Sequence, residues 1–158
     1  MNFEPFSYRR AWAEISGGEQ LPEVVLPITY GMVAGHPAGT RDWFPGHHNP
    51  EYARAQGQEN IYANTMFFQG FLERVVLEWA GPQWFVRSRT LRMFYSVYPG
   101  DTLISTASVV EKTAQDDLQL VQLDVSARTR RPEPAIVAKI QIATINRTPA
   151  ADRTAAAS

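Results

Sequence analysis

The side chains best suited to chemistry gather between Arg41 and Gly57, where a carboxylate, Asp42, precedes an imidazole, His47, by five residues. Held by one short turn, such groups can take a proton from a bound molecule and return it elsewhere on that molecule. On spacing alone, a loop aspartate that pins a turn beside a surface histidine is the favoured interpretation. The residues around the pair must therefore decide its role.

The other histidines carry weaker signals. We expect His48 to be solvated or to support its neighbour, because adjacent loop residues seldom point at the same ligand. A metal site of Asp42, His47 and His48 would lack a further well-spaced strong ligand, so we predict no metal. His36 has no motif around it and is interpreted as structural. Without cysteine, the chain has neither a thiolate nucleophile nor a disulfide.

Composition limits the class of protein. With 158 residues, 44% of them hydrophobic, we predict one domain over 1–158, with a lead-in segment over 1–20 and a disordered tail over 148–158. Fifteen basic residues balance sixteen acidic ones, so no nucleic-acid or membrane partner is expected. The chain shows neither a signal peptide nor an apolar run that would cross a bilayer, and we predict a cytoplasmic location.

The first half of the chain predicts few regular elements. We expect a short helix over 8–15 and a strand over 23–33, which Pro27 restricts to the edge of a sheet. The Gly- and Pro-rich stretch over 34–60 is predicted to be irregular, apart from a short helix over 50–56. Loops of this length in a small domain are usually functional.

The second half is strongly patterned. Asn64 is predicted to cap a helix that runs to Ala80 and stops at Gly81-Pro82; because this helix is apolar nearly all round, we expect it to be buried. Alternating runs over 91–98, 103–112, 118–130 and 135–145 predict four strands in an antiparallel meander. A sheet that curls around the helix satisfies this pattern most simply. We therefore predict an α+β hot-dog fold that pairs with a second hot-dog unit to cover its edge.

The stretch around the acid and base resembles a known motif, Asp-any-Asn-Pro-aliphatic-His-any-Asp-Pro followed by Glu-Tyr-Ala. The matching residues are Asp42, Pro45, His47, Pro50, Glu51, Tyr52 and Ala53, and the turn over 98–102 is similar as well. On these residues the chain resembles the MaoC-like (R)-specific enoyl-CoA hydratases and dehydratases over roughly 21–146. It departs from the motif at Phe44, Gly46 and Asn49, and at Asn64-Thr65, where the family commonly has His-Gly or Pro-Gly.

The segments over 41–43, 61–64 and 78–82, together with the pair His47-His48, are most similar to short hot-dog subunits of heteromeric hydratases for bulky acyl-CoA, including steroid side chains. The resemblance implies hydration of a 2-enoyl thioester, or the reverse dehydration, on coenzyme A or acyl carrier protein and without a cofactor. Asp42 and His47 would activate water, while N–H groups near Asn64 and Thr65 would hold the thioester oxygen. Asn64 is at least as well explained as a helix cap.

Substrate contacts and assembly stay open at this stage. The candidate substrate contacts are Phe44, Phe68, Gly70, Arg87 and Arg89. Core packing is the favoured interpretation of Phe68, and a solvated strand face is the default interpretation of the arginines. The assembly is predicted to be a homodimer or a heteromer with a second hot-dog subunit. Two other functions remain: a non-catalytic subunit that completes the acyl tunnel of a catalytic partner, motivated by Phe44 and Asn49, and a hot-dog thioesterase.

Overall fold

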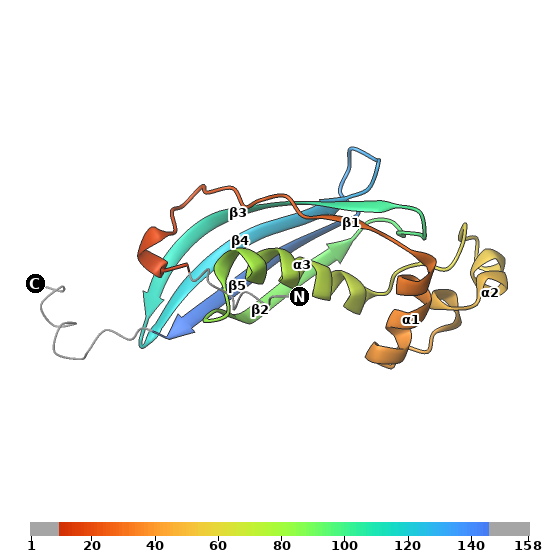
Figure 1. The fold of residues 1–158 in the computed structure, drawn as a ribbon, viewed down its shortest axis with the longest axis horizontal. Helices are drawn as coiled ribbons and strands as arrows, with labels where there is room; N and C mark the ends of the chain where they lie inside the picture. Colours follow the sequence, from red (N-terminus) through yellow and green to blue (C-terminus); the bar gives the residue numbers. More distant parts are fainter. Residues whose placement is uncertain (1–9, 146–158) are drawn as a thin grey trace, which may run out of the picture.

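The computed structural model describes residues 10–145, which form a curved antiparallel sheet with one long helix against its inner face (Figure 1). In chain order the elements are the 3-10 turn η1 (Trp12–Glu14), β1 (Val25–Pro27), α1 (Tyr30–Thr40), the 3-10 turn η2 (Pro45–His47), α2 (Pro50–Ala55), α3 (Thr65–Ala80), β2 (Phe85–Met93), β3 (Thr102–Gln115), β4 (Leu118–Arg128) and β5 (Ile136–Ile145).

The five strands lie in the order β1-β3-β4-β5-β2, and every neighbouring pair is antiparallel. The predicted meander is correct for β3, β4 and β5 but wrong for β2, which pairs with β5 on the far side of the sheet. Pro27 lies in the edge strand β1, as predicted, where the missing N–H costs no central hydrogen bond.

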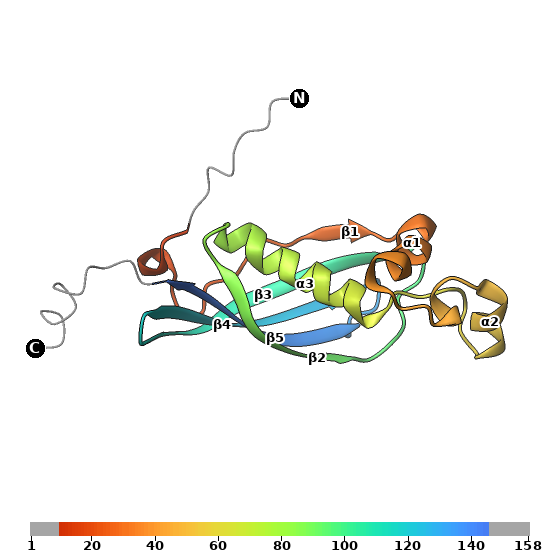
Figure 2. The same cartoon turned by 90° about the horizontal axis from the view of Figure 1, so that it is seen from below.

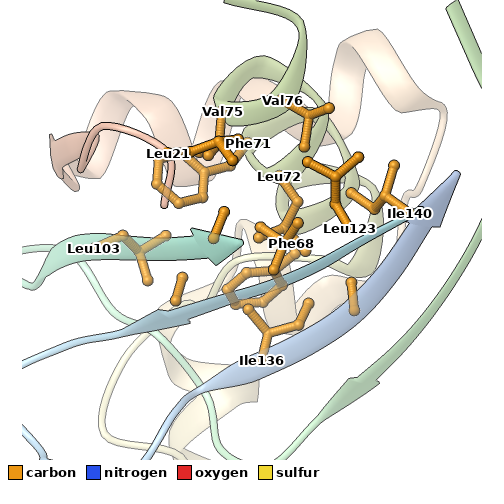
Figure 3. Close-up of a cluster of buried hydrophobic side chains, with 14 of the residues drawn as sticks. Leu21, Phe68, Phe71, Leu72, Val75, Val76, Leu103, Leu123, Ile136 and Ile140 are labelled. Atoms are coloured by element: carbon orange, nitrogen blue, oxygen red, sulfur yellow. The ribbon is translucent and has the colours of Figure 1, made fainter. Parts of the chain in front are cut away.

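The core lies between α3 and the sheet. Phe68, Phe71, Leu72, Val75 and Val76 of α3 meet strand residues that include Leu103, Leu123, Ile136 and Ile140 (Figure 3). In β3, β4 and β5 buried side chains largely alternate with more exposed ones, because successive side chains point to opposite faces. A sheet curled around one buried helix is the hot-dog fold, so the predicted α+β class is confirmed.

The shorter helices gather at one end of the molecule, beside the start of α3 (Figure 2). The prediction of an irregular chain from residue 34 is wrong, because α1 occupies residues 30–40. Thr29 caps α1 by accepting a hydrogen bond from the Met32 N–H. Because the helix begins here, the strand predicted over 23–33 is shortened to β1. The predicted helix over 50–56 is confirmed as α2.

Two predicted elements have different bounds in the structure. The strand expected over 91–98 is β2, which ends at Met93; the chain then leaves the sheet, and Val97 accepts a hydrogen bond from the Ala63 N–H instead. In the described part of the segment predicted as a helix over 8–15, the structure has only η1. The predicted tail over 148–158 lies outside the described residues. No helix within 10–145 is long and apolar enough to cross a bilayer.

Candidate active site

Asp42 and His47 meet beside the start of α3. The chain leaves α1 through Arg41, whose φ of 57° turns it sharply back, and the Asp42 N–H bonds to the Pro37 carbonyl. His47 closes η2, and its Nε2 lies 3.4 Å from Asp42 Oδ2. This separation is slightly longer than an ordinary hydrogen bond. The side chains are 10% and 26% exposed, respectively, so the pair is sheltered but open to a small molecule.

The hydrogen bond of the other ring nitrogen of His47 determines the tautomer of the imidazole. Nδ1 lies 2.8 Å from the Tyr62 carbonyl oxygen, which can only accept a hydrogen bond. Nδ1 therefore carries the proton, and in the neutral ring Nε2 presents its lone pair toward Asp42. An ionised carboxylate and this lone pair are both acceptors. A water molecule that donates one hydrogen to each would satisfy them together.

Asn64 connects the pair to the helix behind it. Its Oδ1 accepts from the Phe67 N–H at 2.8 Å, so it caps α3 as predicted. Its Nδ2 donates to Asp42 Oδ2 at 3.0 Å. No hydrogen bond to the N–H of Thr65 or Met66 is found within residues 10–145, as expected for the first turn of a helix.

Two departures from the family motif fit each other in space. A Cβ atom at Gly46 would lie 2.7 Å from Phe44 Cε1 and 2.8 Å from the Tyr62 hydroxyl, closer than packed atoms approach. The aliphatic side chain usual at this position cannot coexist with these two rings as they stand. The Phe44 ring packs edge-on to His47 and Tyr52, at centroid distances of 5.5 and 5.6 Å.

Tyr62 is a site residue that the sequence did not indicate as such. Burial, reinforced by the neighbouring phenols Tyr52 and Tyr98 and by the Asp42 carboxylate, raises the pKa of its hydroxyl above 10. The phenol is therefore neutral near pH 7. Tyr62 falls within the segment over 61–64, but that resemblance indicated no role for it, because its part in the site consists of a backbone carbonyl and a packed ring.

A cavity of about 230 Å³ opens beside the pair. Its lining residues are His47, Tyr62, Ala63, Asn64, Thr65, Phe68, Met93, Phe94, Tyr95 and Ser96. The predicted residues His47, Asn64, Thr65 and Phe68 thus come together here, and Asp42 adjoins them through His47. The wall formed by residues 93–96 was not predicted, since those residues were interpreted as strand. A larger hollow of about 570 Å³, over the middle of the sheet, includes neither member of the pair.

The remaining substrate candidates lie apart from this cavity. Gly70 is on the exposed side of α3, with open space where a Cβ would stand. Arg89 forms an ion pair with Glu73 of α3, and Arg87 donates to Gln115 at the end of β3. These three residues do not line the cavity beside His47.

The other two histidines are separate from the pair. His48 is exposed and its ring stands edge-on to Trp43. His36 lies on α1 with its ring against Phe67, at a centroid distance of 5.2 Å. Within residues 10–145, no three His, Asp or Glu side chains are grouped closely enough to hold a metal ion.

The fold defines a hot-dog protein, and comparison with known proteins shows its family. Residues 13–130 match the family model described as the MaoC like domain. This match covers more than half of the chain, and the chain belongs to this family.

Individual proteins and solved structures are also similar to this chain. The chain is 33% identical over 92 residues to the 3-oxo-4,17-pregnadiene-20-carboxyl-CoA hydratase beta subunit of Mycobacterium tuberculosis, spanning 58% of this chain and 71% of that protein. The crystal structure of the ChsH1-ChsH2 complex from M. tuberculosis superposes with a TM-score of 0.74 at 27% identity, covering 82% of this chain and 98% of that one. The (R)-hydratase from A. caviae shares the fold, with a TM-score of 0.72 at 16% identity over 81% and 96% of the two chains.

Proposed function

We propose that this protein adds water across the double bond of a 2-enoyl thioester, or removes it in reverse. The observation that carries this proposal is the sheltered Asp42–His47 pair, whose two acceptor atoms face each other 3.4 Å apart. His47 lines the cavity, and Asp42 lies behind it. The related M. tuberculosis subunit is named as part of an acyl-CoA hydratase, which supports the reaction class.

The chemistry needs one water molecule and one proton relay. A water that donates to both Asp42 Oδ2 and His47 Nε2 directs a lone pair of its oxygen away from them, toward the substrate. Its oxygen bonds to Cβ as the pair accepts one proton, and the pair returns a proton to Cα on the same face. The net change is the addition of one water, and dehydration reverses each step. Acid–base catalysis of this kind contributes roughly 10²- to 10⁴-fold.

Negative charge that develops on the thioester oxygen needs hydrogen-bond donors. Among the described residues, none bonds to the N–H groups of Thr65 and Met66 at the first turn of α3, where the helix dipole is positive. Thr65 also lines the cavity together with His47. We propose these N–H groups as the oxyanion site, with Thr65 contributing through its backbone.

Two arginines stack on aromatic residues of the cavity wall, and we propose that they bind the phosphates of the carrier, although neither arginine itself lines this cavity and Arg92 lines the larger hollow over the sheet. The Arg92 guanidinium stands 5.1 Å over the ring of Phe94, and that of Arg131 stands 4.7 Å over the ring of Tyr95. Both rings line the cavity. Within residues 10–145 no carboxylate pairs with either arginine, whereas Arg89 is occupied by Glu73. Arg92 and Arg131 are therefore better placed for an anionic carrier than Arg87 and Arg89.

A second hot-dog subunit would complete the acyl site. The cavity of about 230 Å³ is smaller than the roughly 300–1,000 Å³ of ordinary ligand pockets. Met93 and Phe94, at its margin, are 43% and 51% exposed. The ChsH1-ChsH2 neighbour is a complex of two different chains. These observations support a partner that covers the apolar margin and enlarges the acyl space.

The test is a panel of 2-enoyl-CoA thioesters of increasing bulk, incubated with the protein alone and with a hot-dog protein encoded beside it. Mass spectrometry would report the gain of one water, and a thiol assay would report hydrolysis. We expect a water adduct with wild-type protein and none with Asp42→Asn. Activity that survives both Asp42→Asn and His47→Ala in this subunit, but not the matching changes in the partner, would make this chain the non-catalytic subunit. Release of thiol without hydration would indicate a thioesterase.

A further inference from the structure

The side-chain amide of Asn64 joins three segments of the site. Its Oδ1 accepts from the Phe67 N–H, and its Nδ2 donates both to Thr40 Oγ1 and to Asp42 Oδ2, each at 3.0 Å. Asn64 is only 3% exposed. Both amide hydrogens are therefore used, one toward the end of α1 and one toward the carboxylate.

The orientation of this amide is fixed by its partners. The Phe67 N–H can only donate, so the atom that faces it must be the amide oxygen. The Thr40 hydroxyl donates its own hydrogen to the His36 carbonyl at 3.1 Å, and it is therefore an acceptor toward Asn64. A flipped amide would lose its bonds to Phe67 and Asp42. The network thus aims an N–H at Asp42.

We propose that Asn64 is a positioning residue, which holds the Asp42 carboxylate in the orientation that faces His47. This inference rests on the proposed function of the pair. Among the described residues, Asn64 supplies the one hydrogen bond to the Asp42 side chain, which is otherwise 26% exposed. Without it, the carboxylate is free to turn toward solvent, and the 3.4 Å approach to His47 Nε2 has no support.

The capping and positioning roles use different atoms, so substitutions separate them. Asn64→Asp keeps an oxygen for the Phe67 N–H but places a second oxygen against Asp42 in place of the donor. Asn64→Ser keeps a capping hydroxyl and is too short to reach the carboxylate. Asn49→Asp is a matched control, because Asn49 caps α2 through the N–H groups of Glu51 and Tyr52 and has no contact with the pair.

Steady-state kinetics on the best enoyl thioester from the panel would test this role, with thermal melting to confirm the fold. For Asn64→Asp and Asn64→Ser we expect kcat to fall about 10- to 100-fold, the size of a lost hydrogen bond to a charged group, with KM changed by less than about threefold. Asn49→Asp should match wild type. A wild-type kcat in either folded Asn64 variant would overturn the proposal, as would a loss confined to KM.

Side-chain amide NMR provides a test that needs no substrate. If Asn64 holds Asp42, its two amide protons should exchange slowly with solvent, and their signals should move in Asp42→Ala. Amide protons that exchange quickly, or signals that stay unchanged in Asp42→Ala, would contradict the contact between Asn64 and Asp42. If the wild-type protein hydrates no thioester, the proposed function fails, while this measurement still decides whether Asn64 orients Asp42.

Discussion

Asp42→Asn and His47→Ala, made singly and together, test whether the two side chains act on one water molecule. The Asp42→Asn variant keeps one oxygen that can accept from Asn64, but it loses the charge and replaces the other oxygen with an NH2 donor. Acid–base catalysis is worth about 10²- to 10⁴-fold, or about 3 to 5 kcal/mol. Because both acceptors face the same 3.4 Å gap, each single variant should lose this whole factor, and the double variant should lose no more.

The assay measures the initial rate at which the absorbance of the conjugated enoyl thioester decreases. Thermal melting of each variant confirms that the protein is folded. His48→Ala is the matched control, since it removes the adjacent exposed imidazole, which lies against Trp43 instead of the cavity. It should retain the wild-type rate. Independent contributions would multiply to roughly 10⁴- to 10⁸-fold in the double variant. Multiplied losses, or a wild-type rate in Asp42→Asn, would refute a shared water.

Three further results are expected. Gly46→Ala should lower the free energy of unfolding by about 1–3 kcal/mol, measured by denaturant titration, because its Cβ would overlap two rings; an unchanged stability would contradict this packing. The pKa of the Tyr62 hydroxyl is raised in the folded protein, so the unfolded chain loses the phenol proton first as pH rises past about 10. The melting temperature of the wild type should therefore fall more steeply above this pH than that of Tyr62→Phe. Parallel curves for the two proteins would contradict the raised pKa. Arg92→Ala and Arg131→Ala should raise KM for coenzyme A thioesters about 2- to 5-fold without affecting phosphate-free thioesters, while Arg89→Ala should leave KM unchanged. The reverse pattern would move the proposed carrier site from Arg92 and Arg131 to Arg89.

The sequence predicted the hot-dog class because its strongest signals, one all-round apolar helix and period-two runs, are the elements that make the core. It failed at α1 for a physical reason. Gly31, Gly35 and Gly39 lower helix propensity, and Pro37 lies within the helix. The Thr29 cap and tertiary packing of Val33 outweigh these weak local preferences.

Strand order and the cavity wall were beyond pattern analysis. The residue pattern over 94–98 alternates as in a strand, because Tyr95 and Val97 face the core. The backbone of Val97, however, accepts a hydrogen bond from the Ala63 N–H, so this segment lies beside the start of α3 and not in the sheet. Periodicity reports which side chains are buried but not which backbone they pair with. The contact between Asn64 and Asp42 was equally hidden, because it depends on the left-handed turn at Arg41.

The departures from the family motif change the surroundings of the pair more than the pair itself. Asn49, in place of the second Asp, still caps α2 with two hydrogen bonds of 3.0 Å. Gly46 and Phe44 depend on each other, because the absence of a Cβ at Gly46 leaves the space that the Phe44 ring fills beside His47. These changes remodel the wall behind the imidazole and leave both acceptor atoms in place. None of the three departures at Phe44, Gly46 and Asn49 separates Asp42 from His47, so they give no structural reason to assign the chemistry to a partner subunit.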